Sequence, residues 1–167
     1  MSFPVQLVLA MTLFSGTGSA ADSAPGAEYW QALEWQHRPL LMLVGSGERE
    51  SQRVRDWEER LLANRCALAE RRIHWLEIRD DGVWRRFAGD HSAGFESTRL
   101  GQRAAASVRQ RVAGLSDGAS RLALFGLDGQ RKYLGQPESL EPIWSLIDGM
   151  PMRRAELARD PDDCEPR

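Results

Sequence analysis

A short apolar run, Leu40–Val44 (LLMLV), is followed directly by Gly-Ser-Gly at 45–47 and then by a long helical pattern. Five consecutive apolar residues closed by glycines are typical of a strand that is buried on both faces. A strand that turns straight into a helix begins an α/β domain, and ligands and catalytic groups commonly lie at that turn. This turn contains no cysteine and no Gly-Lys-Ser/Thr phosphate motif, so it indicates a fold class without indicating a chemistry.

The remaining patterns extend this unit into a complete domain. Helical spacing and turn residues predict, in order, a short helix or turn at 29–35, a helix at 48–70, a strand at 73–78, an insertion with strand character at 83–87, a helix at 98–113 capped by Ser97, a strand at 122–127, a strand at 131–134 after the Asp128-Gly129 turn, and a final helix capped by Ser139. The βαβ half requires a parallel strand pair, and the hairpin adds an antiparallel pair. The order β-α-β-α-β-β-α therefore predicts a thioredoxin-like α/β fold, with a four-stranded mixed sheet and helices on both faces.

The first 21 residues have the pattern of a secretory signal. Residues 3–14 are apolar except for Gln6 and Thr12, and small residues follow at 15–21, so cleavage is expected near Ala20 or Ala21. The apolar core is shorter than the ~20 residues that span a bilayer, which favours a cleaved signal over a membrane anchor or a buried helix. We therefore expect a periplasmic or secreted protein with no membrane contact after cleavage, comprising a linker at 22–28, a domain at 29–157 and a disordered tail at 158–167.

The charge balance excludes one common class of partner. The formal net charge is −2, the sequence pI is about 6.0, and the arginines are spread along the chain. This balance lacks the basic patch of a nucleic-acid binder, so no nucleic acid is expected as a partner. His37, His74 and His91 are isolated from one another and from the two cysteines, so the sequence predicts neither a metal site nor a cofactor.

The two cysteines, Cys66 and Cys164, would lie in an oxidising compartment after export. In the expected fold the first and last helices lie on the same side of the sheet, so the tail could bring Cys164 back to Cys66. This arrangement makes a structural disulfide between them a hypothesis. The sequence favours the other interpretation of Cys66, a small side chain at the boundary of the core.

Three segments carry a family resemblance: Trp35–Leu40 (WQHRPL), Gly126–Gly129 (GLDG) with Lys132, and Ile147–Glu156 (IDGMPMRRAE). Together they resemble the bacterial domain-of-unknown-function 4174 family, and the resemblance extends over about 29–157. It implies a thioredoxin-like fold and export, since related domains occur in secreted animal sushi-repeat and matrix proteins. The resemblance brings no established activity and therefore no catalytic residue.

The expected first strand–helix turn is where thioredoxin-like redox enzymes carry a nucleophilic cysteine, because backbone N–H groups and the helix dipole lower its pKa there. Residues 45–51 contain no cysteine, and Ala119-Ser120-Arg121 stands where such enzymes usually carry a proline. The sequence therefore favours a binding or scaffolding role without a dithiol site. The alternatives are a thiol oxidoreductase or peroxiredoxin-like enzyme that uses Cys66 or Cys164, and a cofactor-free enzyme that uses the polar turn.

Two surfaces are candidates for binding an unknown protein or a small anion. Ser46 and Arg49 lie at the expected start of the first helix, where free N–H groups favour anions. The motif at Ile147–Glu156 combines thioether and guanidinium groups. It could bind a partner protein, or it could pack internally beside the first strand as a latch. The candidate residues of this second surface are Trp35, Arg38, Met150, Met152, Arg153, Arg154 and Glu156.

Overall fold

The computed structural model describes residues 27–90, 94–115 and 117–159. The predicted signal segment, most of the predicted linker and residues 160–167 of the predicted tail lie outside these ranges. None of the helices in the described part of the chain has the length and apolar character needed to cross a bilayer. The elements are α1 (Ala27–Leu33), β1 (Arg38–Leu43), α2 (Glu48–Ala63), α3 (Arg65–Glu70), β2 (Ile73–Arg79), β3 (Gly82–Phe87), β4 (Thr98–Arg99), α4 (Gln102–Arg111), β5 (Arg121–Phe125), β6 (Arg131–Gly135), α5 (Glu141–Asp148) and α6 (Pro151–Arg159).

The strands form one mixed sheet in the order β4-β3-β2-β1-β5-β6, with β1 near its centre. β1 pairs in parallel with β2, with Leu41 opposite Leu76, and antiparallel with β5, with Leu41 opposite Ala123. The pairs β2–β3, β3–β4 and β5–β6 are antiparallel. All six residues of β1 are buried, as the apolar run predicts for a strand that is covered on both faces.

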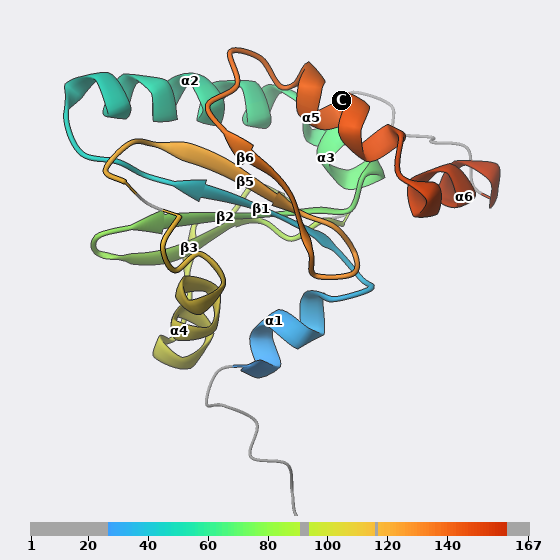
Figure 1. Ribbon diagram of the computed structural model, residues 1–167, viewed down its shortest axis with the longest axis horizontal. Helices are drawn as coiled ribbons and strands as arrows, with labels where there is room; N and C mark the ends of the chain where they lie inside the picture. The colour runs from blue at the N-terminus through green and yellow to red at the C-terminus, as the bar shows by residue number, and fades with distance from the viewer. Residues whose placement is uncertain (1–26, 91–93, 116, 160–167) are drawn as a thin grey trace, which may run out of the picture.

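Helices cover both faces of the sheet (Figure 1). On one face, Leu40 and Met42 of β1 pack in a core cluster with residues of α2, α3 and α5. On the other face, Leu41 and Leu43 pack with Trp30 of α1 and with residues of α4. Because neighbouring strand residues point to opposite faces, one short strand supplies both cores. The prediction of a mixed α/β domain with helices on both faces is confirmed.

The sheet has six strands, so the prediction of four strands is wrong. β3 extends the sheet beyond β2, and the two-residue β4 extends it further. The side chains of Trp84, Arg85 and Arg86 in β3 are only half-buried, which hides the alternation that marks a strand. The helix predicted at 98–113 begins only at Gln102, because Thr98 and Arg99 pair with β3 and Gly101 is the N-cap.

The long helix predicted at 48–70 is divided at Asn64 into α2 and α3. The Asn64 side-chain amide donates a hydrogen bond to the Arg60 carbonyl at 2.7 Å, while its backbone N–H bonds to Leu61. Asparagine side chains compete in this way with the helical backbone. The break leaves Leu61 and Leu68 buried, while Arg65, which interrupts the predicted apolar stripe, is half-buried between them.

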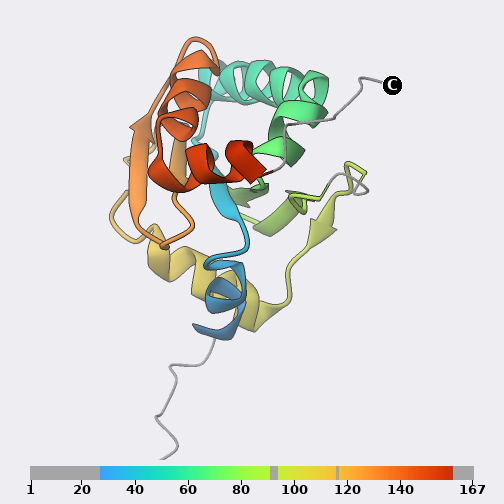
Figure 2. The ribbon, with the colours of Figure 1, turned by 90° about the vertical axis from the view of Figure 1, so that its right-hand side faces the viewer.

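The last helix, α6, has no counterpart among the predicted elements. It begins at Pro151, a residue that suits the first helical position because its missing N–H would be unpaired there anyway. Its pattern is hard to recognise because Arg153 is its only buried residue, whereas an amphipathic helix normally buries apolar ones. Figure 2 shows α6 beside the start of β1, where Glu156 meets Arg38.

Glu77 is a fully buried carboxylate in the middle of β2. Arg79 donates to its Oε2 atom from Nη2 at 2.6 Å and from Nε at 3.0 Å, and the Arg86 Nε lies 3.6 Å from its Oε1. Arg79 also bonds Glu58 of α2 at 3.1 Å, so two carboxylates share these guanidinium groups. Burial, and then the hydrogen bond with Glu58, raise the pKa of Glu77 to about 7 despite the opposing charge of Arg86.

The raised pKa predicts that Glu77 makes folding sensitive to pH. The folded state holds the Glu77 proton more tightly than the unfolded chain, so the unfolding free energy should fall as the pH rises from about 5 to 8. Glu77→Gln removes this titration. The stability difference between variant and wild type should therefore move in favour of the variant by on the order of 2 kcal/mol across that range. Urea denaturation at unit pH steps measures it, and a constant difference would contradict the prediction.

Candidate functional site

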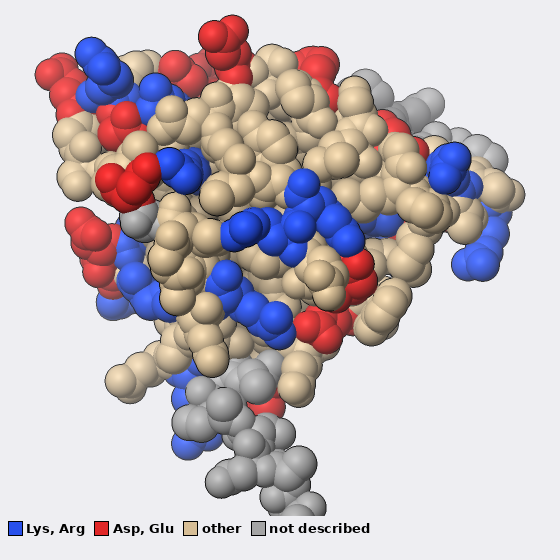
Figure 3. Space-filling view, viewed as in Figure 1, with Lys and Arg blue, Asp and Glu red and all other residues tan. Residues whose placement is uncertain are grey.

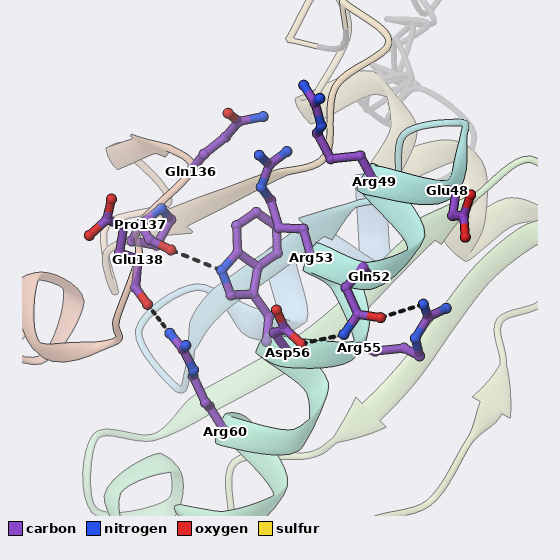
Figure 4. A pocket seen from close by; sticks show the side chains of 11 residues that line it. Glu48, Arg49, Gln52, Arg53, Arg55, Asp56, Arg60, Gln136, Pro137 and Glu138 are labelled. Atoms are coloured by element: carbon purple, nitrogen blue, oxygen red, sulfur yellow. Dashed lines mark hydrogen bonds between the residues drawn. The ribbon is translucent and has the colours of Figure 1, made fainter.

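A groove runs along α2, between this helix and the residues that follow β6 (Figure 4). Its volume is about 890 Å³. Trp57 of α2 is buried beneath it, and its indole N–H donates to the Pro137 carbonyl at 3.0 Å. Arg60 donates to the Glu138 carbonyl. These two bonds hold the wall at 136–138 against the helix. We call this feature the α2 groove; it is lined by Glu48, Arg49, Gln52, Arg53, Arg55, Asp56, Trp57, Arg60, Gln136, Pro137 and Glu138.

Four arginines line the α2 groove, and they differ in what they contact. Arg53 donates to both carboxylate oxygens of Glu50, at 2.6 and 2.8 Å, and Arg55 donates to the side chain of Gln52. Arg49 makes no hydrogen bond or ion pair to any described residue and is exposed. In Figure 4, the Arg49 and Arg53 guanidinium groups extend toward the same end of the groove as the Gln136 amide. That end therefore offers a guanidinium group whose donors are available to a ligand.

The turn between β1 and α2 is closed against the segment that leads into β5. The Gly45 N–H donates to the Ser120 hydroxyl at 2.9 Å, and the Ser120 N–H donates to the Glu50 carboxylate at 2.5 Å. A Cβ atom at Gly45 would lie 2.4 Å from the Gly118 carbonyl oxygen, so only glycine fits here. The backbone bond from Ser120, followed by the bond from Arg53, lowers the pKa of Glu50, which keeps this carboxylate ionised.

Ser46, the other candidate at this turn, is exposed and does not cap α2. Gly47 is the N-cap, with a φ of 102° that lies in the region glycine tolerates. The first turn of α2 therefore receives no side-chain cap. Ser46 and Arg49 lie at the end of β1 opposite to Arg38, so the two candidate surfaces of the sequence analysis are separate places.

The candidates of the last motif are organised around Arg38, which is fully buried at the start of β1. Its two terminal nitrogens donate to the two carboxylate oxygens of Glu156 at 3.1 and 3.2 Å, and one also donates to the Arg71 carbonyl. Arg153 is buried too and donates to the Glu70 carbonyl at 2.8 Å, with Asp148 3.5 Å away. These bonds fix α6 to β1 and α3.

The other candidates of that surface lie outside the buried cluster. Met150 is half-buried against the core on the α2 side of the sheet, whereas Met152 is 44% exposed and Arg154 is exposed. Trp35 is 59% exposed and has a φ of 64°. The structure thus brings Arg38, Arg153 and Glu156 together and leaves Trp35, Met152 and Arg154 at the surface.

Cys66 lies in α3 and is disulfide-bonded, so it is not a free thiol. Cys164, its predicted partner, lies outside the described residues, and the pairing stays a prediction. Within the described ranges, no group of three His, Cys, Asp or Glu side chains is placed to hold a metal ion.

A family model described as "Domain of unknown function (DUF4174)" matches residues 30–156. The chain belongs to this family. No curated protein and no solved structure matches the chain at a significant level. The three segments that carry the resemblance all lie in the DUF4174 domain, and two of them meet where Arg38 binds Glu156. The third meets the first where the Trp35 N–H donates to the Leu127 carbonyl at 2.7 Å.

Sequence reasoning misses most of the α2 groove of the DUF4174 domain. Arg53 and Arg60 follow Arg49 at spacings of four and eleven residues, which places all three on one helical face. That spacing could have indicated the groove. Gln136 and Pro137 carry no such signal, because they reach the helix only through the return of the chain after β6. Figure 3 shows several Lys and Arg side chains gathered near the middle of the face it views, with Asp and Glu side chains bordering them and along the rim.

The buried pair predicts a large cost for removing Arg38. Arg38→Met leaves the Glu156 carboxylate without its bidentate partner and should lower the unfolding free energy by about 3–5 kcal/mol. Arg154→Met removes the same charge from an exposed position of α6 and should change it by less than about 0.5 kcal/mol. Chemical denaturation of both variants measures the difference. Equal effects would contradict the assigned role of the pair.

Proposed function

We propose that this DUF4174 domain is an exported, thioredoxin-like binding domain without thiol chemistry, and that its α2 groove binds an acidic segment of a partner protein. The observation that carries the proposal is the exposed Arg49 guanidinium, which makes no hydrogen bond or ion pair to a described residue, beside Arg53 at one end of the groove. Guanidinium groups suit carboxylates because they can donate two parallel hydrogen bonds.

The arrangement of the central strands supports the thioredoxin-like part of the proposal. A parallel pair, β1 and β2, is connected through α2 and α3, and an antiparallel hairpin, β5 and β6, leads into α5. This is the βαβ half and the ββα half that the sequence pattern predicts. β3 and β4 then extend the sheet at one edge, beyond the four strands β2-β1-β5-β6.

The polar contacts of the β1–α2 turn support a role without thiol chemistry. The Ser120 N–H and Glu50 carboxylate are bonded to each other where a reactive group would need free donors. Cys66 lies in α3, beyond the whole length of α2 from that turn, so the dipole at the start of α2 does not act on it. Export is supported by the signal pattern of residues 1–21.

The size and shape of the α2 groove support a protein segment as the ligand. A volume of about 890 Å³ exceeds what a single small anion fills and lies within the range of ligand pockets. The wall at 136–138 is fixed by bonds to Trp57 and Arg60, so a partner would meet a preformed surface.

Binding of an acidic peptide tests this function. Labelled hexaglutamate should bind the mature protein in fluorescence anisotropy at low salt, hexaglutamine should not, and added salt should weaken binding. Arg49→Gln should weaken it about 2–5-fold, as expected for one exposed charge contact. Arg103→Gln on α4 removes the same charge from the other face of the sheet and is the matched control. Equal weakening by both variants would contradict a specific groove.

An insulin-reduction assay tests the absence of thiol chemistry. With dithiothreitol as reductant, the mature protein should not accelerate insulin precipitation, and Cys66→Ser should behave like the wild type, because no cysteine lies at residues 45–51. Turnover that disappears in Cys66→Ser would instead support the thiol oxidoreductase alternative.

A further inference from the structure

Arg72 has a left-handed backbone conformation at the end of α3. Arg71 is the C-cap of this helix, so Arg72 occupies the next position, and its φ is 52°. Glycine, and sometimes asparagine, normally occupies that position, because a side chain with a Cβ atom destabilises the left-handed conformation. Strained residues that persist in folded proteins cluster at functional sites. The presence of arginine here therefore requires a reason.

The backbone of Arg72 does not supply that reason. Its carbonyl accepts a hydrogen bond from the Arg38 N–H at 2.8 Å, at the start of β1. A glycine would accept the same bond without strain. Arginine differs from glycine at this position by its guanidinium group, and the Arg72 side chain is 49% exposed.

The Arg72 side chain lines a second pocket of about 480 Å³, near the start of β1. Gln36 and His37 form one wall, α3 and α6 another, and Gly89 closes the pocket against His37. A Cβ atom at Gly89 would lie 2.6 Å from the His37 Nδ1, and the φ of Gly89 is 79°, so this wall also depends on glycine.

The carboxylate nearest to Arg72 is already bound by other groups. Glu156 lies 4.0 Å from Arg72, but both of its oxygens accept hydrogen bonds from Arg38. Arg153 is also 3.9 Å from Glu156. Three guanidinium groups thus surround one carboxylate, and Arg72 is the most exposed of the three.

A second cation lines the same pocket. Arg159, in the last turn of α6, is exposed and makes no hydrogen bond or ion pair to a described residue. Glu70 and Asp90 also line the pocket, and Glu70 is 3.5 Å from Arg71. Trp35, the other non-glycine residue with a positive φ in the described chain, directly precedes Gln36 and His37 of the pocket wall.

We propose that this pocket binds a small oxyanion, a carboxylate or a phosphate, through the guanidinium groups of Arg72 and Arg159. Glu156 lies 4.0 Å from Arg72 and already accepts both hydrogen bonds of Arg38, so the Arg72 donors would be available to the bound anion. This site is independent of the α2 groove, because the two share no lining residue.

Replacing Arg72 by glycine separates this proposal from a purely structural role. Arg72→Gly relieves the left-handed strain, so it should raise the melting temperature of the mature protein by about 2–4 °C in dilute buffer. The same variant should lose the binding of inorganic phosphate and succinate, each followed by backbone NMR shifts against chloride at matched ionic strength. A lower melting temperature, or unchanged anion shifts, would overturn the proposal.

A pair of variants on α6 provides the matched control. Arg159→Gln should weaken anion binding at least threefold, whereas Arg154→Gln, which removes the same charge outside the pocket, should leave it unchanged. Binding of phosphate alone would identify a phosphate site, and binding of succinate alone a carboxylate site. An equal loss in both α6 variants would show a general charge effect and overturn the assignment. Failure of hexaglutamate to bind concerns only the α2 groove and leaves these outcomes unaffected.

Discussion

Burial of β1 on both faces is the constraint that arranges the rest of this domain. Its residues pair with a strand on each side and pack against helices above and below, so no side chain in its middle can reach a ligand. Ligand sites must therefore lie at its two ends or on the segments that cover it. Arg38 marks one end and Gly45 the other, and each is held by hydrogen bonds to distant segments. The small-anion pocket lies beside the first end, and the β1–α2 turn leads from the second into the α2 groove.

The arginines at these sites form two groups, which differ in burial and in the bonds they make. Arg38 and Arg153 are buried, and their donors are directed to Glu156, Asp148 and backbone carbonyls of α3 or its end. Removing one of them leaves buried acceptors unpaired, which makes them structural. Arg49 and Arg159 are exposed and contact no described residue, so nothing in the described fold accounts for them. Arg72 belongs to neither group. Its backbone is strained, with a φ of 52°, and its guanidinium group is half-exposed and lies 4.0 Å from Glu156.

The sequence predicts those parts of the fold whose signal is local. The apolar run of β1, the Asp128-Gly129 turn and the helical spacing of α5 each identify an element directly. The break at Asn64 and the buried arginine of α6 depend on hydrogen bonds to particular neighbours, which no periodicity contains. β4 is set by pairing with β3 alone. Of the candidate sites, the motifs that contain Arg38 and Glu156 can be identified in the sequence, but the bond between these two residues, like the wall at 136–138, is created only by folding.

The contact between Glu50 and Ser120 bears on which chemistry the β1–α2 turn can support. A carboxylate with a lowered pKa stays ionised near neutral pH, so Glu50 cannot act there as a general acid. Its oxygens are engaged by the Ser120 N–H and by Arg53, which also makes it a weak base. A negative charge at this turn would raise the pKa of any thiol placed next to it and so oppose thiolate formation. The turn is thus electrostatically suited to holding two segments together, and it is unsuited to activating a nucleophile.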